Sequence, residues 1–121
     1  MHELSICQSI IEQVTDIAQQ NNAQSVIKIV VQIGPLSGVE APLLERAFPI
    51  ASAGSVAQDA ILEMQLLPIR VRCKLCSNEN EATVSKLLCS ACGSWQTSLL
   101  SGDEMLLKSI ELEKDEEQSH V

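Results

Sequence analysis

Four of the five cysteines fall into two closely spaced pairs. Cys73 and Cys76 form one C-x-x-C motif, Cys89 and Cys92 form a second one, and twelve residues lie between the two motifs. A tetrahedral zinc ion takes four soft ligands, and each C-x-x-C turn supplies two thiolates whose charge backbone amides can stabilise. Since protein would fill all four positions, such a zinc would be structural, whereas a catalytic zinc keeps one position open. The spacing therefore predicts a four-thiolate zinc site.

Other chemistry is compatible with the same cysteines. Iron in a rubredoxin-like site would use the same four thiolates, and the spacing does not separate the two metals. Two disulfides or free thiols are the alternative without metal, but paired C-x-x-C motifs in a reducing compartment favour metal. A thiol redox enzyme would need an accessible cysteine of low pKa in place of four metal-bound thiolates.

A second group of potential metal ligands opens the chain. The Met1 amine, the adjacent backbone nitrogens and the His2 imidazole lie within one chelating reach. A nitrogen set of this kind suits square-planar nickel(II) or copper(II). Taken alone, the residues favour a plainer interpretation, in which His2 is a solvated terminal residue and Glu3 is a carboxylate near the positive end of a helix.

Length and charge restrict the class of protein. The chain of 121 residues allows one modest core with a small metal-stapled module, and leaves no room for a large two-domain enzyme. Its formal net charge of −8 makes nucleic acid an unfavourable partner. No apolar stretch approaches the ~20 residues that cross a bilayer, and Glu3 stands where a signal peptide would carry positive charge. We therefore expect a cytoplasmic protein.

Hydrophobic periodicity predicts two elements in the first third of the chain. Apolar residues at steps of three and four predict an amphipathic helix from Leu4 to about Gln20. Cys7 lies on its apolar face, where a small thiol is a common core residue. The β-branched run from Val26 to Ile33 predicts a strand. The residues expected on one face of this strand are Ile27, Ile29, Val31 and Ile33.

Further elements are predicted on both sides of the cysteines. A second helix should begin near Pro42 and stop before Gly54, with a kink or an early end at Pro49. A strand over 61–71 should be interrupted or bulged at Pro68, and another strand should cover 104–113.

Together these elements predict an α+β fold. Two helices would pack on a small three-stranded sheet, with an inserted four-cysteine, zinc-ribbon-like module. The expected divisions are an α/β domain at 1–71 plus 99–113, a zinc-binding module at 72–98 and an acidic flexible tail at 114–121. We expect Trp95 to pack over the zinc module, although an exposed tryptophan could instead anchor a partner.

The sequence resembles the HypA/HybF family of hydrogenase nickel-incorporation proteins over nearly the whole chain before the acidic tail. The MHE start and the paired C-x-x-C motifs are its most specific features. The segments that carry the resemblance, in order, are MHELSICQSIIEQV, IKIVVQIGPLSGVE, RAFPIA, CKLCSNE, LLCSACGSW and LLSGDEMLLKSIELE.

The resemblance implies a nickel metallochaperone rather than an enzyme, with structural zinc and with nickel as cargo. It implies that His2 is the essential nickel ligand in the α/β domain, joined by the Met1 amine and main-chain nitrogens and supported by Glu3. Glu40, in the GVE segment, would lie near the nickel, although the sequence alone favours it as a helix-start carboxylate.

The resemblance also implies partners. Nickel would pass, with a HypB-type GTPase, to the large-subunit precursor of nickel-iron hydrogenase, while some members of the family also serve urease. Urease maturation proteins and a homodimer stay open as further partners, and neither nucleic acid nor a membrane is expected. The alternative is a zinc-ribbon module that binds protein or nucleic acid without nickel transfer.

Overall fold

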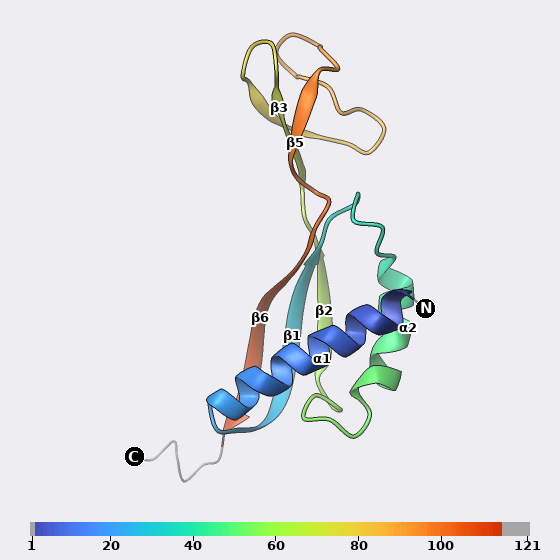
Figure 1. Ribbon diagram of the computed structural model, residues 1–121, viewed down its shortest axis with the longest axis vertical. Coiled ribbons are helices and arrows are strands. Elements are labelled where there is room, and N and C mark those ends of the chain that lie inside the picture. Colours follow the sequence, from blue (N-terminus) through green and yellow to red (C-terminus); the bar gives the residue numbers. More distant parts are fainter. Residues whose placement is uncertain (1, 115–121) are drawn as a thin grey trace. The chain divides into compact units, whose positions relative to one another are not determined.

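The structure is a computed structural model that describes residues 2–114, with the backbone alone at His2 (Figure 1). Its strands form two three-stranded sheets, in the orders β2-β1-β6 and β4-β3-β5. The elements in chain order are α1 (His2–Gln20), β1 (Ala23–Ile33), α2 (Ala41–Ser52), β2 (Ile61–Leu66), β3 (Ile69–Cys73), β4 (Glu79–Ala82), β5 (Thr97–Ser101) and β6 (Met105–Lys114).

The chain forms two compact units. The helical unit takes in residues 40–64 with the described parts of 1–31 and 107–121, and the cysteine unit takes in 32–39 and 65–106. Within the cysteine unit, strand β3 pairs antiparallel with β5. Lys114 is the last residue of β6, and the rest of the expected tail lies outside the described residues.

Helix α1 confirms the predicted periodicity. Its buried face consists of Cys7, Ile10, Val14 and Ala18, at steps of three and four. The helix ends where Asn22 takes a left-handed conformation with a φ of 55°, which asparagine tolerates better than most residues. Figure 1 shows α1 lying across the sheet of β2, β1 and β6.

Helix α2 packs against α1. It buries Leu44, Phe48 and Ser52 at steps of four, and the Leu44 carbonyl accepts a hydrogen bond from the Cys7 thiol at 3.5 Å. Pro49 does not end the helix, which continues to Ser52. Neither helix is long and apolar enough to cross a membrane within the described residues.

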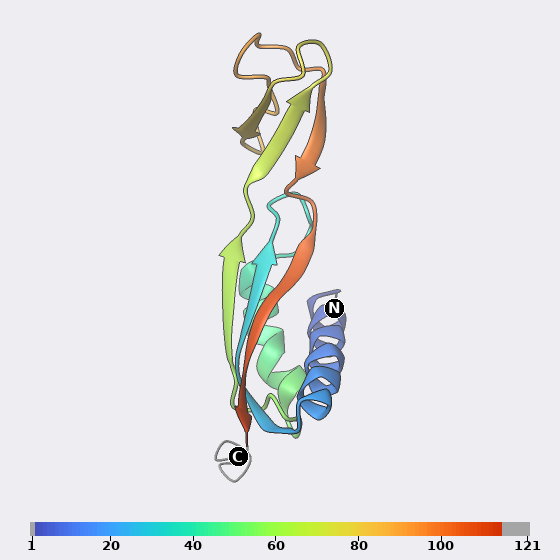
Figure 2. The ribbon, with the colours of Figure 1, turned by 90° about the vertical axis from the view of Figure 1, so that its left-hand side faces the viewer.

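Strand β1 lies between β2 and β6, and Figure 2 shows β2 running in the same direction as β1 and β6 in the opposite direction. Ile29, Val31 and Ile33, three of the residues predicted to share one face, are buried, whereas Ile27 at the start of that series is 44% exposed. Near this end of the strand, Val26 is buried instead. Its N–H donates to the Val56 carbonyl at 2.9 Å, so the segment between α2 and β2 lies against β1 here.

The cysteine unit contains a sheet that the sequence did not predict. The predicted interruption at Pro68 is confirmed, since it separates β2 from β3. Strand β3 then pairs antiparallel with β4 on one side and with β5 on the other. Gly34 lies directly against the Gly102 carbonyl, where a Cβ would have no room.

Candidate metal centres

The structure brings the four paired cysteines into one cluster. Their sulfur atoms all lie within 4.8 Å of one another. The Sγ–Sγ distances are 3.6 Å for Cys73 and Cys92, 3.5 Å for Cys76 and Cys89, and 3.8 Å for Cys76 and Cys92. Zinc–sulfur bonds of ~2.3 Å in a tetrahedron place the sulfurs about 3.8 Å apart. The spacing and the donor set therefore fit a structural zinc ion.

The two C-x-x-C turns repeat one hydrogen-bonding pattern, sixteen positions apart. In the first turn, the N–H groups of Leu75 and Cys76 donate to the Cys73 sulfur at 3.3 and 3.4 Å. In the second turn, the N–H groups of Ala91 and Cys92 donate to the Cys89 sulfur, both at 3.4 Å. The residue after each turn, Ser77 or Gly93, is left-handed, with a φ of 64° or 76°.

These hydrogen bonds favour the charged form of the first thiol in each pair. The N–H of Cys76 makes the largest contribution to lowering the pKa of Cys73, and the N–H of Cys92 does the same for the pKa of Cys89, which falls to about 6. A thiolate is the form that binds metal, so the local backbone prepares one ligand in each turn.

The other thiols resist ionisation until a cation is present. A backbone hydrogen bond with Asn78 lowers the pKa of Cys76, but interactions with Cys89, burial, and the thiols of Cys73 and Cys92 outweigh it and raise this pKa to about 12. Four thiolates at these distances repel one another unless a divalent ion neutralises them.

Zinc affinity is expected to fall with the pH. Because the fold lowers the pKa of Cys89, its thiolate is present above about pH 6 and is lost as the pH falls through that value. Zinc must displace the proton of Cys76 at every pH below about 12, since the pKa of this thiol is raised to about 12. We expect at least about a tenfold loss of affinity per pH unit, steeper below pH 6. Competition with a chelator of known pH dependence measures this, and a flat profile would contradict it.

Two asparagines hold the second cysteine turn against β4. Asn80 accepts the N–H of Ser90 at 3.0 Å and donates to the Leu88 carbonyl at 3.1 Å, much as a paired strand would. Asn78 donates to the Ser90 hydroxyl at 3.3 Å and lies 3.8 Å from the Cys89 sulfur. Sequence analysis missed both residues, because asparagine near a C-x-x-C motif usually signals only a turn.

Replacing Asn80 with alanine is expected to loosen the zinc site. The Asn80→Ala protein loses both hydrogen bonds to the second cysteine turn. Loss of a supporting group of this kind typically lowers metal affinity by a factor of about 10 to 100. Zinc release to a chromogenic chelator should accelerate about tenfold, and the cobalt-substituted protein should change its absorption spectrum. Glu81→Ala, at an exposed position on the same strand, is the control. Equal release rates in both variants would refute this role.

The structure favours a metal site over disulfide bonds or a redox-active cysteine. None of the five cysteines forms a disulfide, and Cys73 and Cys89 are buried. A redox cysteine has to be reachable by its substrate, whereas Cys89, with the lowered pKa, is only 2% exposed. Cys7 is completely buried, and burial raises the pKa of its thiol, as the neighbouring Glu3 does to a smaller extent. Cys7 is a core residue, as predicted.

Two of the expected nickel-site residues, Glu3 and Glu40, meet at the start of both helices. His2 is the first residue of α1, and its side chain and the whole of Met1 lie outside what the structure describes. Glu3 is 7% exposed, and its carboxylate accepts the N–H of Glu40 at 3.5 Å. Glu40 is the N-cap of α2, but its side chain makes no capping hydrogen bond. Residues from two distant parts of the sequence thus lie together beside His2.

Trp95 corrects a prediction. We expected it to pack over the zinc module, but it is 75% exposed. The buried apolar residues of this unit include Ile69, Val71, Cys73 and Cys89, and Trp95 is not part of this core.

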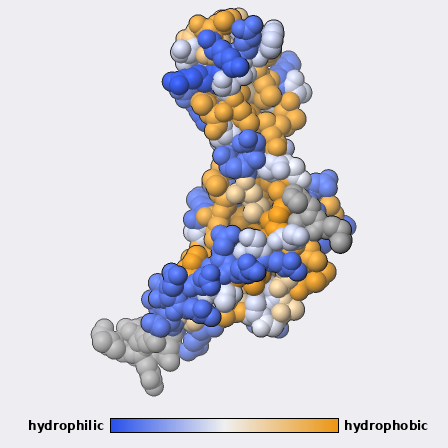
Figure 3. Space-filling model, viewed as in Figure 1, coloured by the Kyte–Doolittle hydropathy of each residue, from blue (hydrophilic) through white to orange (hydrophobic). Residues whose placement is uncertain are grey.

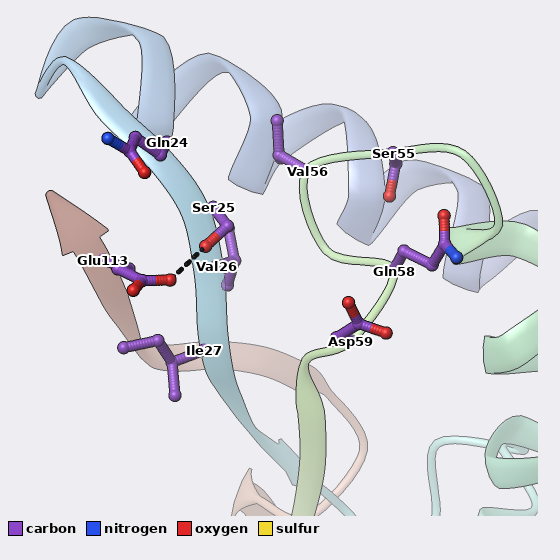
Figure 4. A pocket seen from close by; sticks show the side chains of 9 residues that line it. All are labelled: Gln24, Ser25, Val26, Ile27, Ser55, Val56, Gln58, Asp59 and Glu113. Carbon is purple, nitrogen blue, oxygen red and sulfur yellow. Dashed lines mark hydrogen bonds between the residues drawn. The ribbon is translucent and has the colours of Figure 1, made fainter. Parts of the chain in front are cut away.

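A hollow in the helical unit has no predicted site residue. Its volume is about 410 Å³, and Figure 4 shows the side chains that surround it. Two of its polar side chains are bonded to protein atoms: the Ser25 hydroxyl donates to the Glu113 carboxylate at 3.0 Å, and the side-chain carbonyl of Gln58 accepts the Gly54 N–H at 2.9 Å. We assign it no function. The lining residues are Gln24, Ser25, Val26, Ile27, Ser55, Val56, Gln58, Asp59 and Glu113.

Comparison with known proteins gives one consistent family. Residues 1–112 match the family described as hydrogenase/urease nickel incorporation, metallochaperone, HypA. The hydrogenase maturation factor HypA of Aquifex aeolicus is 48% identical over 115 residues, which cover 95% of this chain and 100% of that protein. The factor of the same name from Nitrosospira multiformis is 46% identical over 112 residues, covering 93% of this chain and 97% of the relative.

Solved structures agree with the sequence relatives. The solution structure of the Ni metallochaperone HypA from Helicobacter pylori matches with a TM-score of 0.70 and 30% identity, over 93% of this chain and 98% of that one. A second solution structure, of a HypA protein, matches with a TM-score of 0.74 and 31% identity, over 95% and 98%. Sequence and fold therefore match the same kind of protein over nearly the whole chain.

Proposed function

The chain belongs to the HypA family of hydrogenase/urease nickel-incorporation metallochaperones, and on this premise we propose that it binds nickel(II) at its amino terminus and delivers it to the large-subunit precursor of nickel-iron hydrogenase. Its relatives are maturation factors and metallochaperones. We infer that it carries a metal and catalyses no reaction.

The observation that carries this proposal is the meeting of Glu3 and Glu40 directly beside His2. Because α1 begins at His2, the N–H groups of His2 and Glu3 belong to the first turn, where backbone nitrogens have no helical partner. The carboxylate of Glu40 makes no hydrogen bond or ion pair with another described residue. Nitrogen and oxygen ligands can therefore converge at this point.

Each ligand has a defined part in the proposed site. The His2 imidazole, the Met1 amine and main-chain nitrogens provide a nitrogen set that suits square-planar nickel(II). Glu3 supports the site from the first turn of α1, where its carboxylate accepts the N–H of Glu40, and Glu40 supplies a nearby carboxylate. The imidazole and amine must be neutral to bind, so mild acid should release the nickel.

A site at a chain end suits a carrier. A closed cage of ligands would hold nickel but release it slowly, whereas a terminal site leaves one side open for an acceptor. In the cysteine unit, we propose that Cys73, Cys76, Cys89 and Cys92 hold zinc permanently, because a closed four-thiolate shell leaves no position for a substrate.

Partners and location follow from the same proposal. We infer a cytoplasmic protein that works with a HypB-type GTPase and the hydrogenase precursor. Urease maturation proteins and a homodimer are further candidates. The competing function is a zinc-ribbon interaction module without nickel transfer, and it would leave the arrangement of Glu3 and Glu40 without a role in metal binding.

Complementation tests this function in cells. In a strain that lacks its own HypA, the wild-type chain should restore nickel-dependent hydrogenase activity, and the His2→Ala variant should restore almost none. His120→Ala removes a histidine outside the proposed site and serves as the matched control. Full restoration by His2→Ala would favour the interaction module.

A further inference from the structure

The four clustered cysteines differ in exposure, and the difference repeats in both turns. In each C-x-x-C turn the first cysteine is buried and the second is exposed. Cys73 and Cys89 are 1% and 2% exposed, whereas Cys76 and Cys92 are in contact with solvent. On the face that Figure 3 shows, hydrophilic side chains lie among the apolar ones of the cysteine unit, so no continuous apolar layer covers it. A small polar molecule in solution can therefore reach two of the four cysteines.

Hydrogen bonds to sulfur distinguish the same two cysteines. In each turn, the sulfur of the buried cysteine accepts two backbone N–H groups at 3.3 to 3.4 Å. The exposed Cys76 and Cys92 take one backbone hydrogen bond each, from Asn78 and Ser94. Because N–H donors draw electron density from a thiolate, a sulfur with fewer donors is the better nucleophile. Exposure and hydrogen bonding thus favour reaction at Cys76 and Cys92.

The two exposed sulfurs also lie close to each other. The Sγ atoms of Cys76 and Cys92 are 3.8 Å apart, although they come from different turns. A disulfide has a sulfur–sulfur bond of ~2.05 Å, so the two atoms would approach by less than about 2 Å. Each of them has a buried sulfur at a similar distance, 3.6 Å for Cys73 and Cys92 and 3.5 Å for Cys76 and Cys89. The buried side chains, however, are enclosed by the unit, and only the exposed pair has room to move.

We propose that Cys76 and Cys92 form an oxidation site, at which hydrogen peroxide joins their sulfurs in a disulfide and so removes two of the four zinc ligands. In the first step one thiolate attacks the O–O bond of the peroxide, an S–O bond forms and hydroxide leaves. In the second step the other thiolate attacks the sulfur of this sulfenic acid, the S–S bond forms, the S–O bond breaks and a second hydroxide leaves. The two thiolates lose two electrons, the peroxide gains them, and two protons from solution convert both hydroxides into water.

Loss of the exposed pair opens the zinc site. Cys73 and Cys89 would remain as its only thiolate ligands, and two thiolates hold zinc much more weakly than a closed shell of four. Permanent zinc binding is therefore a property of the reduced chain. In a reducing compartment a disulfide of this kind is transient, which is typical of redox sensing and not of structural cross-links. The oxidation consumes one peroxide per site, so it does not make the chain a redox enzyme, and it is independent of the nickel proposal.

Peroxide titration of the zinc-loaded, full-length protein tests the oxidation site. Released zinc is followed with a chromogenic chelator, and the remaining thiols are alkylated before the disulfides are mapped by mass spectrometry. We expect zinc release and the loss of two thiols to proceed together, with Cys76 linked to Cys92 as the first product. Dithiothreitol and added zinc should then restore the bound metal.

Two variants separate this site from other oxidation. Cys92→His keeps a fourth zinc ligand but leaves Cys76 without its exposed partner sulfur. Its peroxide-driven zinc release should be at least about tenfold slower than that of the wild type. Cys7→Ser removes the buried thiol outside the cluster and should behave as the wild type does. If Cys92→His takes up no zinc, the disulfide map of the Cys7→Ser protein decides the question alone.

Four outcomes would overturn the oxidation site. The first disulfide could lie within one turn or include Cys73 or Cys89. Zinc could leave without any disulfide being formed, or it could stay bound after both exposed cysteines have been oxidised. Equal rates of zinc release from Cys92→His and the wild type would show that the exposed pair has no special part in the reaction.

Discussion

Replacing His2 with alanine is expected to abolish tight nickel binding while leaving zinc in place. Loss of a supporting group typically weakens a metal site by a factor of about 10 to 100, and loss of a direct ligand should cost more than about a hundredfold. Calorimetric titration of zinc-loaded protein with nickel, with metal analysis of each sample, measures both effects.

An extension of the chain ahead of Met1 tests the same site without altering any side chain. It converts the terminal amine into an amide, so the amine can no longer bind metal, and we expect a comparable loss of nickel affinity. The His120→Ala protein should bind as the wild type does. If the extended protein and His2→Ala both kept wild-type nickel affinity, the amino terminus would not be the nickel site.

Replacing Cys89 with serine is expected to remove zinc and unfold the cysteine unit. Cys89 is 2% exposed, and its sulfur accepts hydrogen bonds from Ala91 and Cys92 that hold the second turn in shape. A unit this small has little apolar core, so a metal cross-link supplies much of its stability. We expect zinc affinity to fall by more than about a hundredfold, and proteolysis to cut within 65–106.

Cys7→Ser is the control for this experiment. Cys7 is equally buried, but it belongs to the helical unit and lies outside the cluster. Its variant should retain one zinc ion and a protease-resistant cysteine unit. A Cys89→Ser protein that kept both properties would show that the four thiols do not act as one site.

Local sequence patterns were enough to predict the elements that follow a regular period. In α1, the steps of three and four between Cys7, Ile10 and Val14 define a buried face without reference to any other element. The cysteine cluster was predictable for a similar reason, because each C-x-x-C turn fixes two ligands locally and tetrahedral geometry then requires two such turns.

Features that depend on tertiary packing were not predictable from local patterns. Strand β4 has the sequence ENEA, which carries no apolar alternation, and it is held by pairing with β3. Trp95 looked like a core residue by its type, but it is 75% exposed and lies outside the buried core of the cysteine unit. Ile27 follows the strand period, yet only its neighbour Val26 is covered at that end of the sheet.

The proposed nickel site combines both kinds of information. Its first residues are adjacent in sequence, so the chain alone was enough to predict that they could chelate one metal ion. Glu40 is 37 positions from Glu3, and only the packing of α2 on α1 brings its N–H to the Glu3 carboxylate. The sequence alone predicted that Glu40 stands at the start of a helix. This prediction is confirmed, because Glu40 is the N-cap of α2.

The most direct test of the carrier mechanism is transfer of nickel itself. Protein loaded with one equivalent of radioactive nickel is mixed with the metal-free hydrogenase large-subunit precursor in the presence of a strong chelator, and the two proteins are then separated by size. The carrier mechanism predicts that the label moves to the precursor from the wild type and that the His2→Ala protein delivers none. Label captured by the chelator in both cases would contradict it.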